Sequence, residues 1–436
     1  MMLILAVKSV RHRPGRFLAT LLAAFLGAAV VMVFGSLDDT AARPGIDPVS
    51  ADSLSTTASI VGGYGSLLVF CAIASTLTVN VRQRSAELEL LRRSGATPAQ
   101  LTRMVVGEAV TVALAGGLLA IGPAMAAGRA LLGVFQDGGQ VTHGVAYSFG
   151  PVALLSGIGT TLLAAAGAAF LAVRRATRPA PATGRARTVL GAAALAAGAG
   201  SVLSTYAFAA TDEWLMAAPA YGAILLSVGC ALLAPPLLGR LLRRLPLDGA
   251  SGWLAVRNVR RRADQLAGIL SSLVLFTAVA TVTLSLQAVE TRAVEASGAV
   301  RSVDARTLQN VNLTVVGIVV AFVCVMLVNS LYAATSYRGR EFGQQRLAGG
   351  TPGQVLTTVA AESLIVTAAG VLLGSLTALA GIIPFTMVRA GGLLPDASLG
   401  IWPAVVAVAA AATLGTSLLT ARRVVRTPMV RAVAAA

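Results

Sequence analysis

The sequence contains few of the residues on which enzymes commonly rely. Its 436 residues include a single lysine, Lys8, with two histidines and three cysteines. A P-loop needs a glycine-rich segment before a lysine that reaches the nucleotide phosphates. Seven residues without a glycine precede Lys8. ATP hydrolysis by that route is therefore excluded for this polypeptide.

The histidines and cysteines do not form a pattern that would seat a metal ion or a catalytic group. His12 and His143 are far apart in the sequence and belong to no Ser/His/Asp or His-x-x-x-His arrangement. Cys71, Cys230 and Cys324 lie in apolar runs without metal-ligand spacing, which is typical of small packing residues. We expect no cofactor, no metal and no enzymatic activity in this chain.

Charged residues are also scarce. They make up 12% of the chain, against about 25% in soluble proteins, and the mean hydropathy is +0.79. A helix needs about 20 uncharged residues to cross a bilayer. Ten runs reach this length, and they predict an all-α integral membrane protein with ten transmembrane helices. The runs are 17–37, 53–81, 109–128, 138–173, 188–211, 214–239, 265–289, 307–337, 363–388 and 397–421.

The basic residues predict the orientation. If both termini are cytoplasmic, 28 of the 34 lysines and arginines face the cytoplasm, as the positive-inside rule requires. The net charge of +16 is then explained by a basic rim facing anionic lipid headgroups of the bilayer, and we expect no nucleic-acid partner.

One stretch of the sequence occurs twice, at residues 84–108 and 338–362, with a constant offset of 254. The identical pairs are Arg84/Arg338, Glu87/Glu341, Arg92/Arg346, Gly95/Gly349, Thr97/Thr351, Pro98/Pro352, Gln100/Gln354 and Glu108/Glu362. Residues 254–262 likewise echo residues 5–13, again just before an apolar run. These echoes predict a duplication, with two parallel four-span repeats on either side of a two-span insert.

The predicted boundaries follow from the Pro- and Arg-rich segment 174–187. Residues 1–175 form the first repeat, which begins with an amphipathic helix on the inner leaflet. Residues 176–245 form the linker and insert, and residues 246–436 form the second repeat. Small-residue pairs such as Gly370 and Gly374 predict close helix packing within the repeats.

Each copy of the repeated stretch predicts a polar helix, a glycine that ends this helix, and a second helix that begins with an N-cap. Gly95 or Gly349 supplies the position just after the polar helix. The next helix has a threonine N-cap, a proline at its first position and a glutamine that can close a capping box. We expect a short, well-capped helix at the membrane surface, with a polar face available to a partner. The capping residues are Thr97, Pro98 and Gln100, and Thr351, Pro352 and Gln354.

The motif R-x-x-E-x-x-x-L-R-R-x-G-A-T-P-x-Q-L, together with the basic amphipathic N-terminal segment, resembles the FtsX-like permease family, the membrane subunits of MacB-type ABC transporters. The ten-span layout is similar to the bacitracin-resistance type of that family. The resemblance implies a partner, an ABC ATP-binding subunit that forms a homodimer, binds ATP and magnesium, and takes one permease chain per dimer. It also implies that the helices beginning at Thr97 and Thr351 are coupling helices.

The implied contact residues are Arg92, Arg93, Gly95, Thr97, Pro98, Gln100 and Arg103 in the first copy, with Arg346, Gly349, Thr351, Pro352 and Gln354 in the second. The alternative is that these residues only turn the chain between spans. Glu108 and Glu362 also have two interpretations. Each could pass motion from the coupling helix to its span, or each could only cap the free N–H groups of a first helical turn.

The sequence therefore favours a membrane permease of a bacterial plasma membrane, which exports or extracts a hydrophobic or amphipathic compound by mechanotransmission. An ion-coupled carrier is the first alternative, although the predicted spans enclose no charge. A force-relaying regulator that transports nothing is the second. Relatives usually carry a large extracytoplasmic domain, whereas the predicted outer connections 36–55 and 288–309 are short.

Overall fold

The computed structural model describes residues 14–83, 85–177, 183–210, 212–241, 250–261, 263–296, 303–336, 339–392 and 400–425. Within these ranges every regular element is a helix. The helices are α2 (Pro14–Ala41), α3 (Pro48–Gln83), α4 (Ser85–Arg93), α5 (Pro98–Asp137), α6 (Pro151–Thr177), α7 (Thr183–Leu203), η2 (Ser204–Ala207), η3 (Glu213–Met216), α8 (Ala217–Leu241), α9 (Ala250–Arg261), α10 (Ala263–Ala296), α11 (Val303–Ser336), α12 (Gly339–Leu347), α13 (Pro352–Ala390) and α14 (Ile401–Val425). The amphipathic helix predicted at the N-terminus lies mostly outside the described residues.

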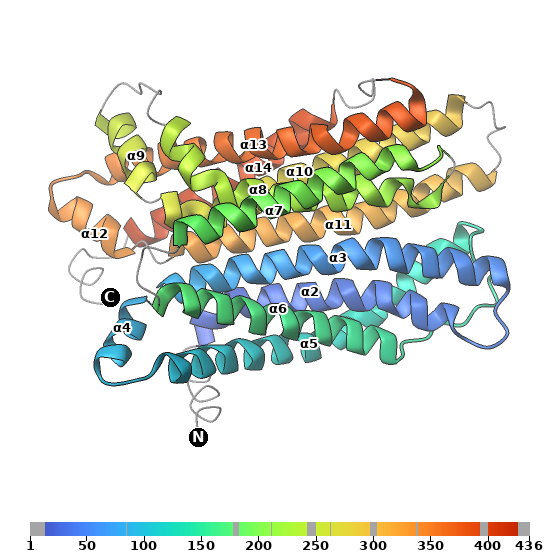
Figure 1. Cartoon of the computed structure of the whole chain (residues 1–436), viewed down its shortest axis with the longest axis horizontal. Helices are drawn as coiled ribbons and strands as arrows, with labels where there is room; N and C mark the ends of the chain where they lie inside the picture. Colours follow the sequence, from blue (N-terminus) through green and yellow to red (C-terminus); the bar gives the residue numbers. More distant parts are fainter. Residues whose placement is uncertain are drawn as a thin grey trace.

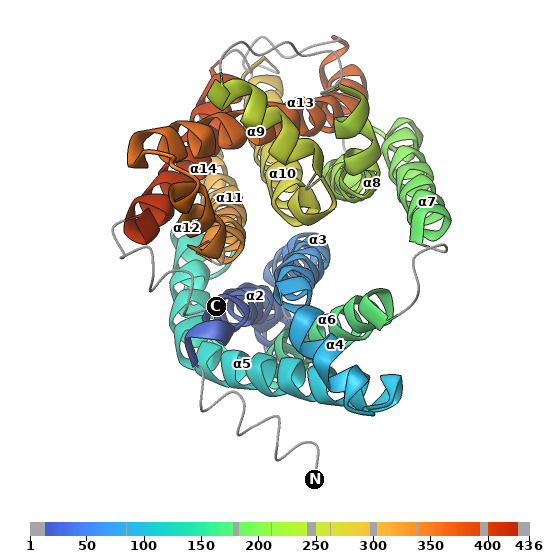
Figure 2. The same cartoon turned by 90° about the vertical axis from the view of Figure 1, so that its left-hand side faces the viewer.

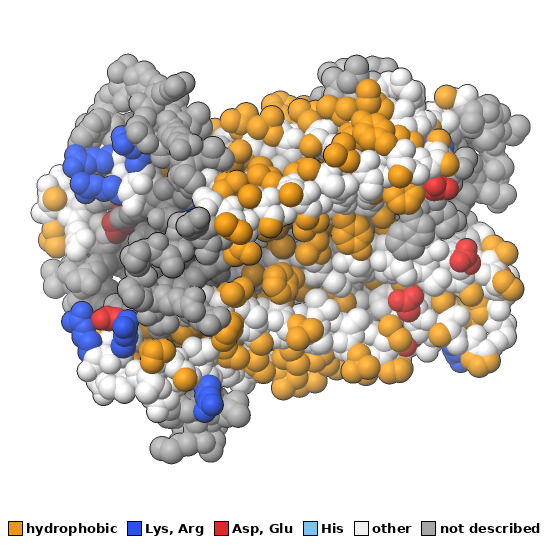
Figure 3. All heavy atoms as spheres, viewed as in Figure 1, with side chains coloured by type: hydrophobic (Ala, Val, Ile, Leu, Met, Phe, Trp, Pro, Cys, Tyr) orange, Lys and Arg blue, Asp and Glu red, His pale blue; other side chains and the backbone are white. Residues whose placement is uncertain are grey.

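The long helices run side by side, and the short helices α4, α9 and α12 lie together at one end, which we call the basic end (Figure 1). Figure 3 shows arginine side chains gathered at that end, an apolar band along the middle, and acidic side chains mainly toward the opposite end. An apolar band between two polar ends is what a bilayer-spanning protein requires.

Eight of the helices, α2, α3, α5, α6, α7, α10, α13 and α14, are long and apolar enough to cross a membrane. This confirms an all-α protein with multiple candidate spans. Each of the ten uncharged runs contains a long helix, but the described apolar parts of α8 and α11 are shorter, Ala217–Leu233 and Val316–Asn329. The count of ten spans therefore stays a prediction.

The long helices form two bundles, visible when the molecule is viewed from the basic end (Figure 2). In the first bundle, α2 packs against α3, α5 and α6. In the second, α10 packs against α11, α13 and α14. Helix α8 packs on α10 and α13, and α7 covers α8, so the inserted pair belongs mainly to the second bundle.

Glycines bring the central helices of each bundle close together, as the small-residue pairs predicted. A Cβ atom on Gly116 of α5 would lie 2.9 Å from the Cβ of Ala24 on α2. A Cβ atom on Gly370 of α13 would lie 2.6 Å from the Cβ of Leu273 on α10. Real side chains do not tolerate such contacts, so these helix pairs can pack this closely only with glycine at both positions.

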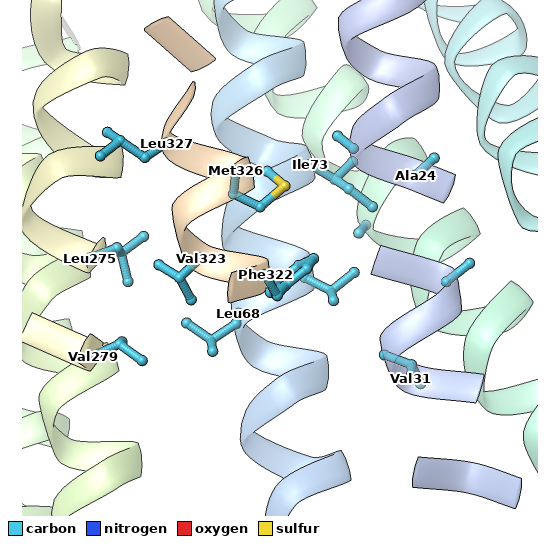
Figure 4. Packing of buried hydrophobic residues seen from close by; sticks show 14 of the residues in the cluster. Ala24, Val31, Leu68, Ile73, Leu275, Val279, Phe322, Val323, Met326 and Leu327 are labelled. Carbon is cyan, nitrogen blue, oxygen red and sulfur yellow. The ribbon is translucent and has the colours of Figure 1, made fainter. Parts of the chain in front are cut away.

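The two bundles meet in a seam where α11 and α10 of the second bundle contact α2 and α3 of the first (Figure 4). Buried apolar side chains fill this seam, among them Phe322 and Met326 of α11 and Ile73 of α3. A polar contact also crosses it, where Nδ2 of Asn329 donates to the Ala19 carbonyl at 2.7 Å. The bundles are therefore held together mainly by apolar packing at this seam.

At the end opposite the basic end, the loop between α5 and α6 is tied to α2. The buried carboxylate of Asp39 accepts hydrogen bonds from the backbone N–H groups of Gly150, Val152 and Ala153, at 2.9, 3.1 and 2.8 Å. These groups belong to the start of α6, whose dipole favours a negative charge there. The carboxylate therefore fixes the beginning of α6 against the end of α2.

Candidate functional site

The repeated stretch folds into two similar turns at the basic end, which we call the first elbow (residues 85–108) and the second elbow (residues 339–362). In the first, α4 ends at a glycine with a left-handed backbone, Gly95 at φ +99°. The Ala96 N–H donates to the Leu91 carbonyl at 3.0 Å, and the Gly95 N–H donates to Arg92 at 3.1 Å. These two bonds form a Schellman motif, and Gly95 occupies the position after the helix that the sequence predicted for it.

The second elbow repeats this geometry. Gly349 has φ +92° and donates to the Arg346 carbonyl at 3.1 Å. The Gly350 N–H donates to the Gln345 carbonyl at 3.0 Å. Only glycine adopts this conformation without steric cost, which explains why it stands at the same place in both copies.

Both predicted capping boxes are present. In the first elbow, the Gln100 N–H donates to Thr97 Oγ1 at 3.3 Å, and the Thr97 N–H donates to Gln100 Oε1 at 2.9 Å. In the second, the matching bonds of Thr351 and Gln354 measure 3.2 and 3.0 Å. Pro98 and Pro352 occupy the first helical position, where a missing N–H costs nothing.

The length of the capped helices differs from the prediction. The caps begin α5 and α13, continuous helices of 40 and 39 residues, rather than short separate helices. Each extends for roughly 60 Å at 1.5 Å per residue. Arg103 and Glu108 interrupt the apolar pattern of the sequence but not the helix, because both residue types are compatible with a helix interior. The separate short helices are instead α4 and α12.

Buried apolar residues anchor each short helix. Phe342 of α12 is fully buried in a cluster with Val355 and Val359 from the first turns of α13. Leu88 occupies the equivalent place on α4 and is buried as well. The matching residues of α5, Leu101 and Val105, are also buried. The short helices are therefore held to the long ones by packing and not only by the chain.

Most of the residues assigned to a partner contact are exposed. In the first elbow these are Arg92, Arg93, Gly95, Thr97, Pro98, Gln100 and Arg103, and in the second they are Gly349, Thr351, Pro352 and Gln354. Arg93 pairs with Glu89 at 3.2 Å, but both side chains are largely exposed, so the pair adds little stability.

Arg346 differs from this group. It is half-buried, and its Nη1 donates to the carbonyl of Val425 at the end of α14, at 2.8 Å. A cation at a helix C-terminus interacts favourably with the helix dipole. Arg346 therefore ties α12 to α14, and its predicted contact with a partner stays a prediction.

Two exposed leucines were missed by the sequence reasoning. Leu90 on α4 is 68% exposed, and Leu347 on α12 is 60% exposed. Both lie on the nine-residue helices at the basic end, whose buried anchors are Leu88 and Phe342. Single exposed leucines are common on protein surfaces, so no sequence signal distinguishes these two.

Glu108 and Glu362 lie well beyond the first turns of α5 and α13 and are 2% and 6% exposed. The interpretation that they cap a first helical turn is therefore wrong. Oε1 of Glu362 accepts a hydrogen bond from Nδ2 of Asn258 on α9, at 2.8 Å. Glu362 thus connects α13 to the short helix that precedes the second bundle.

A family model described as "FtsX-like permease C-terminal" matches residues 59–181 and 313–429, which together exceed half of the chain. The chain belongs to the FtsX-like permease family. No curated protein matches it. Permeases of this family are components of ABC-type transporters, are not the catalytic subunit and generally work with an ABC ATPase. The chain is accordingly a multi-pass protein of the cell membrane.

Both elbows of this FtsX-like permease fall inside the matched segments, whereas α2, α7, α8 and α10 lie wholly or largely outside them. Among the described residues, no group of three His, Cys, Asp or Glu side chains is placed to hold a metal ion. The elbows, which repeat one turn and one cap and expose polar side chains at the basic end, are the candidate site.

Proposed function

We propose that this FtsX-like permease is the membrane subunit of an ABC transporter, and that a homodimer of a separate ATPase docks on its two elbows. The observation that carries the proposal is the pair of elbows, with the same turn, cap and buried anchor at the same end of the molecule. A symmetric dimer presents two equivalent surfaces. Two similar elbows on one chain match that arrangement, with one permease per ATPase dimer.

The charge distribution supports placing the elbows in the cytoplasm, where ATP is available. Arginine side chains gather at the basic end (Figure 3), where the exposed arginines of α4 and α9 lie. Basic residues concentrate on the cytoplasmic side of membrane proteins. Both termini would then be cytoplasmic, and ATP and magnesium would be bound by the partner.

The family match also supports the predicted duplication. The two matched segments begin at residues 59 and 313, which have the same offset of 254 as the repeated stretch. We therefore retain the division into repeats at 1–175 and 246–436, with the inserted pair α7 and α8 between them.

The long helices supply a mechanism for transmitting motion. Because Leu88 and Phe342 anchor the short helices, a push on an elbow moves the first turns of α5 or α13. Each helix is continuous to the opposite end, so the displacement is carried across the bilayer. The bundles would then shift along the apolar seam of α11. A hydrophobic or amphipathic compound that reaches such a seam from the lipid is the expected substrate.

The test uses glycines with left-handed backbones at the two ends. Gly95→Val with Gly349→Val strains the elbows, while Gly45→Val with Gly391→Val strains turns at the opposite end. All four glycines have positive φ, and a Cβ on any of them meets no other atom within 4 Å. Each substitution should cost about 1–2 kcal/mol of folding free energy. The two pairs therefore match in strain and differ in location.

Each variant is co-purified with the ABC ATPases of the same genome, and ATP hydrolysis is measured in the complex. We expect the native chain and the Gly45/Gly391 variant to retain one ATPase, and the Gly95/Gly349 variant to lose it. Equal retention by both variants would contradict docking at the elbows. Solute movement down an ion gradient by the purified permease alone would instead favour the carrier alternative.

A further inference from the structure

Helix α9 has two distinct faces. Ala255 and Val259 are buried and Asn258 is partly buried, and their spacing places them on one side of the helix. Arg257, Arg260 and Arg261 are exposed and lie on the opposite side, again three or four residues apart. The first face packs on α13, and the second forms a basic strip at the surface.

The contact between Asn258 and Glu362 places α9 at the edge of the hydrocarbon. Glu362 is the last charged residue before the uncharged run 363–388, so its side chain stands where the apolar layer begins. The apolar part of α10 begins at Gly268, a few residues after α9 ends. The headgroup layer is only about 5–7 Å deep on each side of the bilayer. The arginines of α9 are within one turn of Asn258 along the helix, and their long side chains can reach that layer.

Lipid phosphates are the anions present at this depth. A guanidinium can bind a phosphate through two parallel hydrogen bonds, and three guanidiniums on one strip complement a cluster of anionic headgroups. Seen from the basic end, helix α9 lies over α13 and α10 (Figure 2), at the end of the bundle where the spans leave the hydrocarbon. The charge and the position of the strip thus both favour lipid over a soluble ligand.

We propose that the exposed face of α9 binds anionic lipid headgroups, and that the hydrogen bond from Asn258 to Glu362 transmits this binding to α13. Lipid held by the arginines fixes α9 at the headgroup layer. Because α9 is bonded to a buried carboxylate of the second elbow, α13 becomes less free to move. The regulatory half rests on the proposed function of α13, whereas the binding half does not.

The binding test uses Trp253, the tryptophan of α9. After Trp214→Phe and Trp402→Phe, which remove the other two tryptophans, the full chain is reconstituted in mixed vesicles of phosphatidylglycerol and phosphatidylcholine. One lipid at a time carries brominated acyl chains, which quench nearby tryptophan fluorescence. We expect stronger quenching by brominated phosphatidylglycerol than by brominated phosphatidylcholine at equal mole fraction.

The variant Arg260→Gln with Arg261→Gln should lower this preference by about fivefold for each arginine removed. Arg422→Gln with Arg423→Gln removes two exposed arginines from α14 at the same end and should leave the preference unchanged. Equal quenching by both lipids in the native chain would overturn the proposal. Loss of the preference on adding excess inorganic phosphate would also overturn it, because the strip would then be a site for free anions.

The coupling test measures hydrogen exchange over residues 352–362 in the same two lipids, without an ATPase. Exchange should be slower in phosphatidylglycerol for the native chain and equal in both lipids for Asn258→Ala, which should keep the quenching preference. Asn258→Gln should restore part of the difference. If Asn258→Ala keeps the full lipid dependence, the coupling half is wrong. Neither readout needs docking at the elbows, so the two proposals can fail separately.

Discussion

The two elbows have similar backbone geometry but expose different side chains. Both have the Schellman turn, the capping box and a buried anchor. The first presents Arg92, Arg93 and Arg103 to solvent. In the second, Arg346 is turned toward α14, and Thr357 stands where the first has Arg103. The turn and the cap are thus kept in both copies, while the exposed arginines of the described residues stand on the first elbow.

The largest expected effect comes from the shared anchor. Phe342→Ala should cost about 3–5 kcal/mol of folding free energy, and Leu88→Ala about 2–4 kcal/mol, because each leaves a cavity beneath a short helix. Thermal unfolding in detergent measures both, and ATPase co-purification measures the consequence. We expect both variants to lose the ATPase. If only one does, the elbows do not act as an equivalent pair.

Removing arginines should affect ATPase association differently at the two elbows. Reversing Arg92, Arg93 and Arg103 to glutamate should slow ATPase association by about tenfold at low salt, because exposed charges act mainly on the association rate. Arg346→Gln should change that rate little and should instead cost about 1 kcal/mol of stability, since it removes a bond to a helix C-terminus. Binding kinetics at two ionic strengths give the answer. Equal rate effects would show that the surfaces are equivalent after all.

Removing the N-cap side chain should destabilise the two elbows equally. Thr97→Ala and Thr351→Ala each remove one capping hydrogen bond and should each cost about 1 kcal/mol. Hydrogen exchange at the first turns of α5 and α13 reports the loss. If the two substitutions differ by more than about 1 kcal/mol, the two caps contribute unequally to helix stability although their geometry is alike.

The smallest effect concerns the opposite end, where the bundles are held differently. Arg389 pairs with Glu290 in the second bundle at 2.6 Å, and in the first Asp47 accepts from Thr142 and from the Ser50 N–H. The side-chain bond from Thr142, with the Ser50 backbone bond, lowers the pKa of Asp47 from 3.8 to about 2. A lowered pKa stabilises the loop above pH 4, and the contribution is lost as the pH falls toward 2.

Hydrogen exchange over residues 139–147 should therefore speed up between pH 4 and pH 2, after correction for the intrinsic rate. Thr142→Val should move the midpoint upward toward 3.8, the ordinary pKa of an aspartate. Exchange at the elbows should not change in step with it. An unshifted midpoint would show that Thr142 does not control this carboxylate.

The sequence was sufficient for local structure at the elbows. Glycine, threonine, proline and glutamine at fixed spacing determine turns and caps through bonds within a few residues, so both were predicted correctly. The continuity of α5 was not predicted, because the sequence analysis placed a helix boundary where the hydropathy changed. The role of Arg346 and the carboxylate of Asp39 also escaped prediction. Both bond partners that are far away in the chain, and no local pattern reveals such contacts.

The central claim is that α5 and α13 carry motion from the elbows to the opposite end. Spin labels test it in a chain whose three cysteines, Cys71, Cys230 and Cys324, are replaced by alanine. One labelled pair, Ala99→Cys with Gly353→Cys, reports the elbows. The other, Asp137→Cys with Ala390→Cys, reports the far ends of the same helices, and all four positions are exposed.

Pulsed electron paramagnetic resonance then measures both distances in the permease–ATPase complex, without nucleotide and with trapped ATP. If the helices move as continuous bodies, both distances change together. A change at the elbows with no change at the far ends would mean that α5 and α13 bend within the membrane, for instance at Pro123 and Pro384, and would contradict the account.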